Sequence, residues 1–341
     1  MIESVQFKNF KALRDATLPL GRFTLIVGPN GSGKSTALQA LQALHEPKGL
    51  DYLRIVSAHQ RKHHYRDPTT NVEITVNWAG VSRPTAIYVI WERGFPGTKK
   101  TVELSEQGVQ KDKIGGPFNR ILKGIRLYSL DAPAIAVPVL LKRTPELEES
   151  GAGLAGVLDQ LRDVNPKRFE QLTAALKNWL PEYDQIVFEV ADPGKRSFLL
   201  RTREGYRIAA ADLSQGTLIA LAILTLAYLP NPPSVACFEE PDRAVHPRLL
   251  RRVQDALYRL AYPESFGEKR EPVQVIATTH NPYFLDLFKD HPEEVVIAEK
   301  KGLEGSFHRL VDLPHWEEIL EGAQLGDVWY TGILGGVPAG T

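Results

Sequence analysis

Residues 2–10 alternate between apolar and polar side chains, which predicts a β-strand at the start of the chain. A short apolar strand is expected over 23–27, followed by a glycine-rich loop. From about 34 to 44 the apolar residues recur at helical spacing, so a helix should follow the loop. The opening of the chain therefore predicts a strand, a loop and a helix in direct succession.

The middle of the chain is predicted to be β-rich and then helical. Strands separated by turn residues are expected over 71–78, 85–91, 100–104 and 125–130. Residues 144–180 follow with apolar positions on one helical face. Two further strands are expected over 185–190 and 197–201.

From residue 212 onward, strands and helices alternate. Helices are expected over 214–229, 248–260 and 282–288, and strands over 234–239, 273–278 and 294–298. Alternation of this kind predicts parallel strands with helices packed on the faces of the sheet. The fold class is therefore α/β.

The composition indicates a soluble globular protein. The 341 residues are 43% hydrophobic, and Lys plus Arg equal Asp plus Glu at 41 each, so any nucleic-acid surface must be a local patch. The longest apolar run, 218–229, is shorter than the roughly 20 residues of a membrane span, and the first residues lack the apolar core of a secretion signal. Cys237 is the only cysteine, so an intrachain disulfide and a multi-cysteine metal site are excluded. We therefore expect a cytoplasmic location.

The loop after the second strand carries the phosphate-binding pattern G-x-x-x-x-G-K-[ST] as GPNGSGKST, residues 28–36. Glycines let the backbone wrap around phosphates, so that N–H groups and the helix N-terminus point at the anion. Lys34 is expected to reach the β- and γ-phosphates of ATP, and the Ser35 hydroxyl to bind Mg²⁺. The predicted nucleotide-binding residues are Asn30, Gly31, Ser32, Gly33, Lys34, Ser35 and Thr36.

Two adjacent carboxylates, Glu239 and Glu240, follow the apolar residues 235–238 of a predicted strand. Ligands of open α/β sheets bind at the carboxyl ends of the strands. We expect Glu239 to hold the Mg²⁺ shell and Glu240 to orient or deprotonate the attacking water. An exposed acidic strand end without a catalytic role is the alternative.

The sequence Leu213-Ser214-Gln215-Gly216-Thr217 precedes the most apolar helix. A serine and a glycine at a helix start indicate, by themselves, ordinary capping. The segment resembles the ABC signature Leu-Ser-Gly-Gly-Gln, and it lies shortly before the paired acids, as that signature does. The resemblance implies that Ser214 and Gly216 bind the γ-phosphate held by a second copy of the chain, where a helix dipole would also favour it.

A histidine, His280, ends the strand that should neighbour the acidic one. A single histidine is more often structural, but at this place it is expected to sense the γ-phosphate as part of the catalytic set with Lys34 and Glu240. It resembles the switch histidine of ABC ATPases.

The phosphate loop, signature, paired acids and switch histidine occur in the order and approximate spacing of an ABC ATPase. The segments 5–11, 239–241, 246–247, 325–329 and 334–336 resemble those of AAA-family ATPases related to RecF, to the structural-maintenance-of-chromosomes proteins and to the overcoming-lysogenization-defect family. This resemblance covers nearly the whole chain. It implies a P-loop NTPase of ABC type, with a mixed central sheet, helices on its faces, a β-rich subdomain and a helical insertion.

The same resemblance implies a single ABC-type ATPase domain over 1–341. Its expected parts are a phosphate-loop part at 1–48, a β-rich part at 49–130 and a lid-like helical insertion at 131–182. The last part, 183–341, carries the signature, the acidic strand and the switch histidine.

Some positions depart from the family pattern. Gln215 and Thr217 replace a Gly and a Gln of the signature. Asp242-Arg243-Ala244-Val245 stands where relatives have Glu-Asn-Gly and an apolar residue, in the segment that resembles the D-loop. Gln60 is the best-placed candidate for the Q-loop glutamine, with a plain surface residue as the alternative.

Two basic clusters are candidate contacts for nucleic-acid phosphates, with solvated surface as the alternative for each. They consist of His59, Arg61, Lys62, His63, His64 and Arg66, and of Arg201, Arg203 and Arg207. A metal site at the histidines lacks partner acids at ligand spacing.

These features predict an Mg²⁺-dependent ATPase that forms a homodimer around two ATP molecules and uses hydrolysis as a switch. The family resemblance favours DNA repair, recombination or defence against foreign DNA, with DNA or a DNA-processing protein as the partner. No long heptad region lies between 37 and 212, and no nuclease motif follows, so neither coiled-coil arms nor a nuclease activity is expected. A transporter-type ATP-binding subunit is the rival that the Glu-Glu pair disfavours. A regulatory module with little hydrolysis is the rival that the presence of both acids disfavours.

Overall fold

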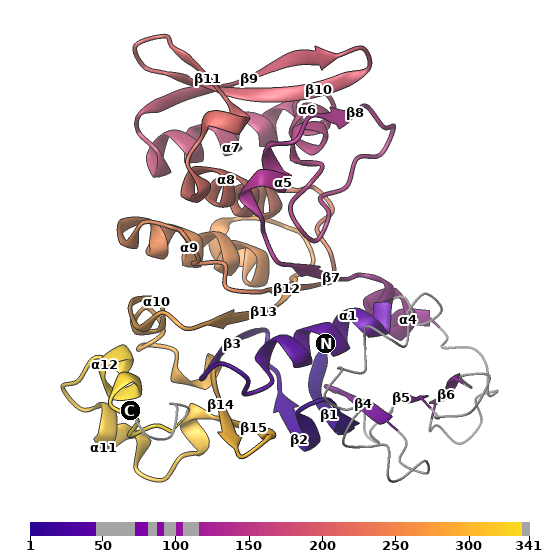
Figure 1. The fold of residues 1–341 in the computed structure, drawn as a ribbon, viewed down its shortest axis with the longest axis vertical. Coiled ribbons are helices and arrows are strands. Elements are labelled where there is room, and N and C mark those ends of the chain that lie inside the picture. The colour runs from indigo at the N-terminus through magenta and orange to yellow at the C-terminus, as the bar shows by residue number, and fades with distance from the viewer. Residues whose placement is uncertain (46–71, 81–86, 92–99, 105–115, 336–341) are drawn as a thin grey trace. The chain divides into compact units, whose positions relative to one another are not determined.

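The computed structural model describes residues 1–45, 72–80, 87–91, 100–104 and 116–335. Its contacts divide the chain into two compact units (Figure 1). Unit 1 contains Met1–Leu127, Ser234–Cys237 and Gln274–Thr341, and unit 2 contains Tyr128–Pro233 and Phe238–Val273. The chain therefore passes between the units at the ends of strands, and unit 1 is assembled from distant parts of the sequence.

Unit 1 contains two sheets. The larger sheet has the strand order β15-β14-β3-β13-β12-β7, and the smaller one has the order β2-β1-β4-β5-β6. The strands are β1 Ile2–Phe10, β2 Leu13–Pro19, β3 Phe23–Val27, β4 Val72–Trp78, β5 Ile87–Trp91, β6 Lys100–Leu104, β7 Ile125–Tyr128, β12 Val235–Phe238, β13 Gln274–Thr279, β14 Val295–Lys301 and β15 Glu304–Arg309. The helices are α1 Lys34–His45, α4 Gly116–Lys123, α10 Pro282–Asp286, α11 Trp316–Leu320 and α12 Leu325–Tyr330.

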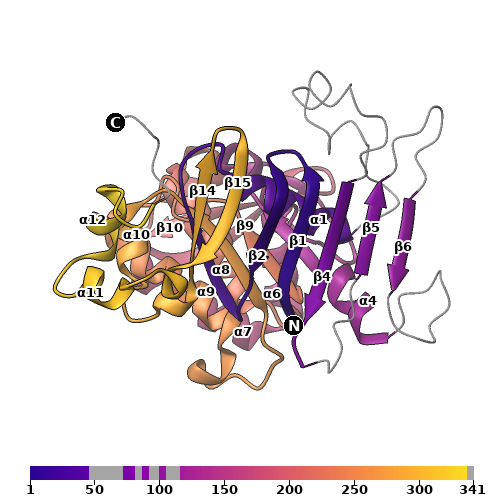
Figure 2. The same cartoon turned by 90° about the horizontal axis from the view of Figure 1, so that it is seen from below.

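One hydrophobic core joins α1 to both sheets of unit 1. Leu38 and Leu41 of α1 are fully buried in the same cluster as Phe7 of β1 and Ile26 of β3. Burial of side chains of this size stabilises the fold by about 1.5–3 kcal/mol each. Strand β15 lies beside β2, where the N–H of Gly305 donates to the carbonyl of Ala12 (Figure 2). The phosphate-loop helix, which is rich in the good helix formers Ala, Leu and Gln, is thus also held by a large apolar contact.

A buried glutamine at the start of β13 connects three segments of unit 1. The Nε2 of Gln274 donates to the carbonyls of Ile2 at 2.6 Å and Gly21 at 2.8 Å, and its Oε1 accepts from the N–H of Ile2 at 3.0 Å. The side chain is only 5% exposed, so water does not replace these bonds at low cost. Gln274 therefore fixes β1 and the β2–β3 connection against the large sheet.

Replacing Gln274 with Ala should lower the free energy of unfolding by about 2–4 kcal/mol, because it leaves buried backbone groups at Ile2 and Gly21 unpaired. Urea unfolding followed by circular dichroism would measure the change. Gln185→Ala, at an exposed position of a strand, is the matched control and should change the free energy by less than about 0.5 kcal/mol. Equal stabilities for the two variants would contradict the connecting role of Gln274.

Unit 2 combines a four-stranded antiparallel sheet with helices. In this sheet β10 pairs with β8, β9 and β11. The elements are α5 Ala132–Ala136, β8 Val139–Leu140, α6 Leu154–Val164, α7 Pro166–Trp179, β9 Tyr183–Asp192, β10 Lys195–Thr202, β11 Arg207–Ala209, α8 Gln215–Tyr228 and α9 Leu250–Ala261. Every residue of α8 from Thr217 to Tyr228 is buried, so this helix forms the centre of unit 2.

An ion-pair cluster around Glu268 joins α7, α9 and the segment after α9. Glu268 contacts Arg270 and Arg259 at 2.6 Å each, and Arg168 at 3.5 Å. Burial alone would raise the pKa of Glu268, but the hydrogen bond from Arg270 and the three positive charges lower it below its usual value. The guanidinium of Arg259 also lies 4.3 Å from the ring centre of Tyr228. The cluster therefore compensates its own buried charges.

The predicted α/β class with a mixed central sheet is confirmed. Most predicted elements from residue 214 onward are present within a few residues. The helical prediction over 144–180 was too long, because the chain is irregular up to α6 and breaks before Pro166. Several short elements were not predicted, namely β2, α4, α5, β8, β11, β15, α11 and α12. No helix among the described residues is both long and apolar enough to cross a membrane.

Candidate nucleotide-binding site

The predicted phosphate loop connects the end of β3 to the start of α1. Gly31 and Gly33 have φ angles of 76° and 99°, in the left-handed region that favours glycine. Gly28 lies against β14 so closely that a Cβ at this position would be 2.2 Å from the carbonyl oxygen of Ala298. These glycines allow the tight backbone path that presents N–H groups and a helix N-terminus to phosphate.

The side chain of Lys34 lies inside this loop. It is 5% exposed, and its ammonium donates to the carbonyls of Gly28 at 2.7 Å and Pro29 at 2.9 Å. The hydroxyl of Ser32 is buried and has no hydrogen-bond partner among the described residues. Ser35 is exposed at the first turn of α1. The loop therefore holds a buried cation beside an open hydroxyl, which fits a polyphosphate and a hard metal ion.

The remaining predicted loop residues also lie at the start of α1. Asn30 is exposed at the rim of the loop, and Thr36 is half-buried. Both are therefore placed where a nucleotide on the loop would come close to them.

The predicted switch histidine lies at the same edge of the sheet as the phosphate loop. Strand β13 runs parallel to β3, and its last residue, Thr279, is paired with Val27, the last residue of β3. His280 therefore follows its strand at the same level as Gly28 follows β3. Beyond it, Asn281 caps α10 by accepting the N–H of Tyr283 at 3.0 Å. This register brings His280 and the loop together within unit 1.

The paired acids follow β12 and belong to unit 2. Glu239 and Glu240 are both half-buried, and the N–H of Glu239 donates to the carbonyl of Tyr128 at 2.8 Å. Glu240 has a φ angle of +46°, which costs a non-glycine residue about 1 kcal/mol or more. Such backbone strain at a carboxylate is common at functional positions, where the surrounding structure fixes the side chain direction.

Ser214 is the N-cap of α8. Its hydroxyl accepts the N–H of Thr217 at 3.1 Å and lies 2.8 Å from the Thr217 hydroxyl, so the capping interpretation is confirmed. Gly216 packs against the segment that resembles the D-loop, because a Cβ there would be 2.6 Å from the carbonyl oxygen of Ala244. The two segments therefore form one surface of unit 2.

The other predicted contacts have mixed outcomes. Arg201 forms a double hydrogen bond with Asp184, at 2.8 and 2.9 Å, which lowers the pKa of the Asp184 carboxyl. Its guanidinium is thus engaged within unit 2, while Arg203 and Arg207 are exposed. Gln60 and the basic cluster from His59 to Arg66 lie outside the described residues.

The hairpin of β14 and β15 contacts the phosphate loop at places that no sequence motif marks. A Cβ at Gly305 would lie 2.2 Å from the carbonyl oxygen of Ser32, and one at Gly31 would lie 3.3 Å from the Nζ of Lys300. Leu13 packs between the loop and the hairpin, because a Cβ at Gly33 would be 2.6 Å, and one at Gly305 3.1 Å, from its Cδ2. A glycine within a strand, such as Gly305, can indicate that another backbone comes close, but the sequence alone does not say which segment that is.

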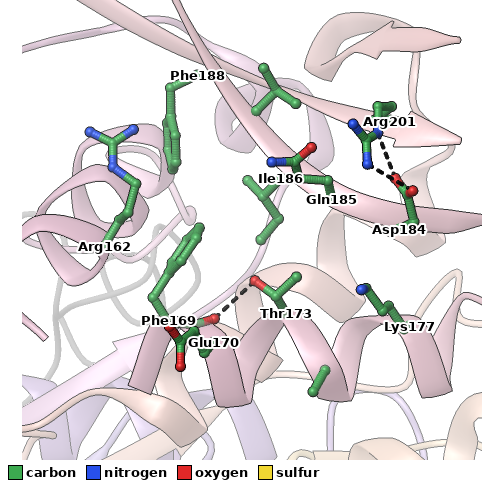
Figure 3. A pocket seen from close by; sticks show the side chains of 12 residues that line it. Arg162, Phe169, Glu170, Thr173, Lys177, Asp184, Gln185, Ile186, Phe188 and Arg201 are labelled. Atoms are coloured by element: carbon green, nitrogen blue, oxygen red, sulfur yellow. Dashed lines mark hydrogen bonds and ion pairs between the residues drawn. The ribbon is translucent and has the colours of Figure 1, made fainter. Parts of the chain in front are cut away.

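A separate groove of about 910 Å³ lies wholly in unit 2 (Figure 3). The rings of Phe169 and Phe188 are in contact, with centres 5.9 Å apart and planes tilted by 39°, and the guanidinium of Arg162 lies 4.5 Å from the centre of the Phe188 ring. Lys177 and the Arg201–Asp184 pair line its other end. None of the predicted nucleotide-binding residues lines this groove.

Two further observations limit the chemistry. The described residues contain no group of three or more His, Cys, Asp or Glu side chains that could hold a metal ion by themselves. Burial raises the pKa of Cys237 in β12 to about 12, so its thiol stays protonated and unreactive. A metal ion here would need phosphate oxygens and water among its ligands, as Mg²⁺ with nucleotides does.

Two family models match the chain. Residues 87–286 match the model described as "AAA domain, putative AbiEii toxin, Type IV TA system". Residues 1–123 match the model described as "AAA ATPase domain". Together the two matches cover the phosphate loop, the signature-like segment, the paired acids and the switch histidine.

Curated proteins with similar sequences include a nuclease and a transporter subunit. The OLD nuclease of Thermus scotoductus is 25% identical over 346 residues, which cover 87% of this chain and 64% of the nuclease. The chain therefore spans less than two thirds of the length of that relative. The sulfate/thiosulfate import ATP-binding protein CysA of a Synechocystis species is 50% identical over 46 residues, 13% of each protein.

Solved structures with the same fold are heads of SMC proteins. The SMC head bound to the C-terminal winged-helix domain of ScpA is 16% identical with a TM-score of 0.57, over 90% of this chain and 96% of that one. The SMC head with an extended coiled coil, bound to the C-terminal domain of ScpA from Pyrococcus furiosus, is 14% identical with a TM-score of 0.57, over 94% and 98%. The likeness confirms an SMC-head-like P-loop fold.

Proposed function

We propose that this chain, which belongs to the family described as "AAA domain, putative AbiEii toxin, Type IV TA system", binds ATP with Mg²⁺. We further propose that it hydrolyses ATP in a head-to-tail homodimer. The family models match AAA domains, in agreement with the ABC-like AAA ATPase predicted from the motifs. The observation that carries the proposal is the phosphate loop, in which Gly31 and Gly33 have left-handed backbones and the buried ammonium of Lys34 donates to the loop carbonyls of Gly28 and Pro29.

Within one copy, Lys34 would exchange its bonds to the loop carbonyls for the β- and γ-phosphate oxygens. Ser35 and Glu239 would hold Mg²⁺, which would neutralise charge on the β- and γ-phosphates as ADP leaves. Glu240 would orient the attacking water and accept its proton, and His280 would contact the γ-phosphate from the neighbouring strand. These roles match the residue types to in-line attack on the γ-phosphate.

The second copy would complete the site. Ser214 and Gly216 lie at the N-terminus of α8, a buried helix whose dipole favours an anion at this end. Presented to the γ-phosphate of the opposite copy, they would add hydrogen-bond donors to that phosphate. The loop, the signature-like segment and the neighbouring 242–245 segment would then form the dimer interface.

The process that this ATPase serves is proposed to involve DNA. The OLD relative is named as a nuclease, and the structural neighbours are SMC heads. We therefore infer an ATP-driven switch in DNA repair, recombination or defence against foreign DNA, acting on DNA or a DNA-processing partner. The transporter alternative has one observation in its favour, the 46-residue match to CysA. A regulatory module would bind ATP with little hydrolysis, so a measurement of phosphate release would distinguish it from the proposed ATPase.

Replacing Lys34 with Met should weaken ATP binding by about 10–100-fold, because the loop loses its buried cation while keeping a side chain of similar length. Equilibrium binding of methylanthraniloyl-labelled ATP, together with Mg²⁺-dependent phosphate release by the wild-type protein, would test the proposed function. Lys167→Met, an exposed lysine of α7, is the control. Wild-type protein that binds no ATP, or an unchanged affinity for Lys34→Met, would overturn it.

A further inference from the structure

The hairpin of β14 and β15 carries a second lysine to the rim of the phosphate loop. The Nζ of Lys300 would be 3.3 Å from a Cβ at Gly31, and its Cε would be 3.8 Å away, so the ammonium end rests on this glycine. Gly31 is exposed, and the loop on both sides of it is in contact with the same hairpin, at Ala298 and Gly305. The ammonium of Lys300 therefore lies at the rim of the loop, although Lys300 belongs to none of the sequence motifs.

The backbone that carries Lys300 is fixed by strand pairing on both sides. Ile297 of β14 pairs with Val27 at the end of β3, and Lys300 itself pairs with Gly305 of β15. Lys300 therefore lies three residues beyond the point where β3 turns into the phosphate loop. The exposed four-carbon side chain keeps its rotational freedom on this fixed backbone.

Among the described residues, the ammonium of Lys300 has no hydrogen-bond or ion-pair partner. Its side chain is exposed, whereas the adjacent Lys301 lies 3.9 Å from Glu299. The loop beside it already has the ammonium of Lys34 and the N-terminus of α1, which both produce a positive potential. A third positive group is unfavourable there by itself, and it becomes favourable when a polyanion binds.

We propose that Lys300 contacts the phosphate chain of the bound nucleoside triphosphate from the outer rim of the loop, opposite Lys34. An ammonium on a four-carbon stem is a mobile point charge with three donors, which suits a phosphate approached from the side. The assignment rests on the proposed function, and it adds a residue that the phosphate loop, signature, acidic and histidine motifs do not include.

Binding of methylanthraniloyl-labelled ATP and ADP to four proteins tests the assignment: wild type, Lys300→Met, Lys300→Arg and Lys301→Met. Lys300→Met keeps the packing on Gly31 and removes the charge, so we expect about tenfold weaker ATP binding. Lys300→Arg should stay within about twofold of wild type, as should Lys301→Met. A loss for ATP alone would place the contact at the terminal phosphate, and a loss for both nucleotides would place it nearer the nucleoside.

The controls separate this assignment from the proposed function. If wild type binds ATP and Lys300→Met binds it equally well, Lys300 is surface only and the assignment is wrong, while the proposed function stands. If Lys300→Arg is as weak as Lys300→Met, the side chain acts through packing on Gly31 and not through charge, which also overturns the assignment. Failure of wild type to bind either nucleotide would overturn both.

Discussion

Replacing Glu240 with Gln should lower ATP turnover by about 10²–10³-fold while ATP binding stays near that of the wild-type protein. Gln has the shape of Glu and keeps a hydrogen-bonding oxygen, but it cannot accept the proton of the attacking water. Glu240 is the second residue after β12 and has a φ angle of +46°, so its backbone is held in the left-handed conformation. Steady-state phosphate release and labelled-ATP binding, measured on the same preparation, would separate the two effects.

The same variant should trap the dimer. With bound ATP that is not hydrolysed, the shared γ-phosphate keeps both copies together, so light scattering should show a monomer without nucleotide and a dimer with Mg-ATP. Glu271→Gln, an exposed acid before β13, is the control and should turn over at the wild-type rate. Normal turnover by Glu240→Gln would remove Glu240 from the catalytic role, and a monomer with Mg-ATP would contradict the two-copy site. The trapped dimer is also the form in which DNA binding should be tested.

The parts of the site that lie on continuous sequence motifs were predictable. The strand, loop and helix from β3 to α1 follow from an apolar run, a glycine-rich turn and helical spacing, and each signal is local. The prediction of an AAA-type ATPase related to the SMC and OLD proteins is confirmed by the family models and the structural neighbours. The roles of Glu240, His280 and Ser214 stay predictions.

The parts that depend on distant pairing were not predictable. β2 has two consecutive exposed residues after Leu13, so its alternation is broken and only its pairing with β1 makes it a strand. β15 is recognised as a strand by its pairing with β14. Lys300 looks like one of two adjacent surface lysines until the parallel pairing of β14 with β3 places it at the loop.

The segment that resembles the D-loop shows how the structure explains a departure in the sequence. Ala244 has a φ angle of +60°, the left-handed conformation, at the position where the family pattern has Gly. The carbonyl of Ala244 lies against Gly216, and Arg243 donates to the carbonyl of Leu130 at 3.1 Å. This chain therefore has a left-handed backbone, which favours glycine, at an alanine.

Replacing Ser214 with Asp should lower ATP turnover by about 10²-fold without destabilising the protein. Ser214 has a visible structural role as the N-cap of α8, so an Ala variant would confuse loss of the cap with loss of a phosphate contact. Asp is as good an N-cap as Ser, and its carboxylate would repel a γ-phosphate. Ser214→Thr, which keeps both the cap and the hydroxyl, is the control and should stay near the wild-type rate. Wild-type turnover by Ser214→Asp would mean that Ser214 only caps the helix.

Mixing Ser214→Asp with Lys34→Met would then show whether the serine acts on its own copy or on the other one. Each variant alone should be nearly inactive, since every site has either a defective loop or a defective signature. In a mixed dimer, the intact loop of the Ser214→Asp copy meets the intact signature of the Lys34→Met copy, so one of the two sites is complete. With random pairing at equal concentrations, turnover should recover to about a quarter of the wild-type value. If Ser214 served the loop of its own chain, every site in the mixture would remain defective and no activity would return.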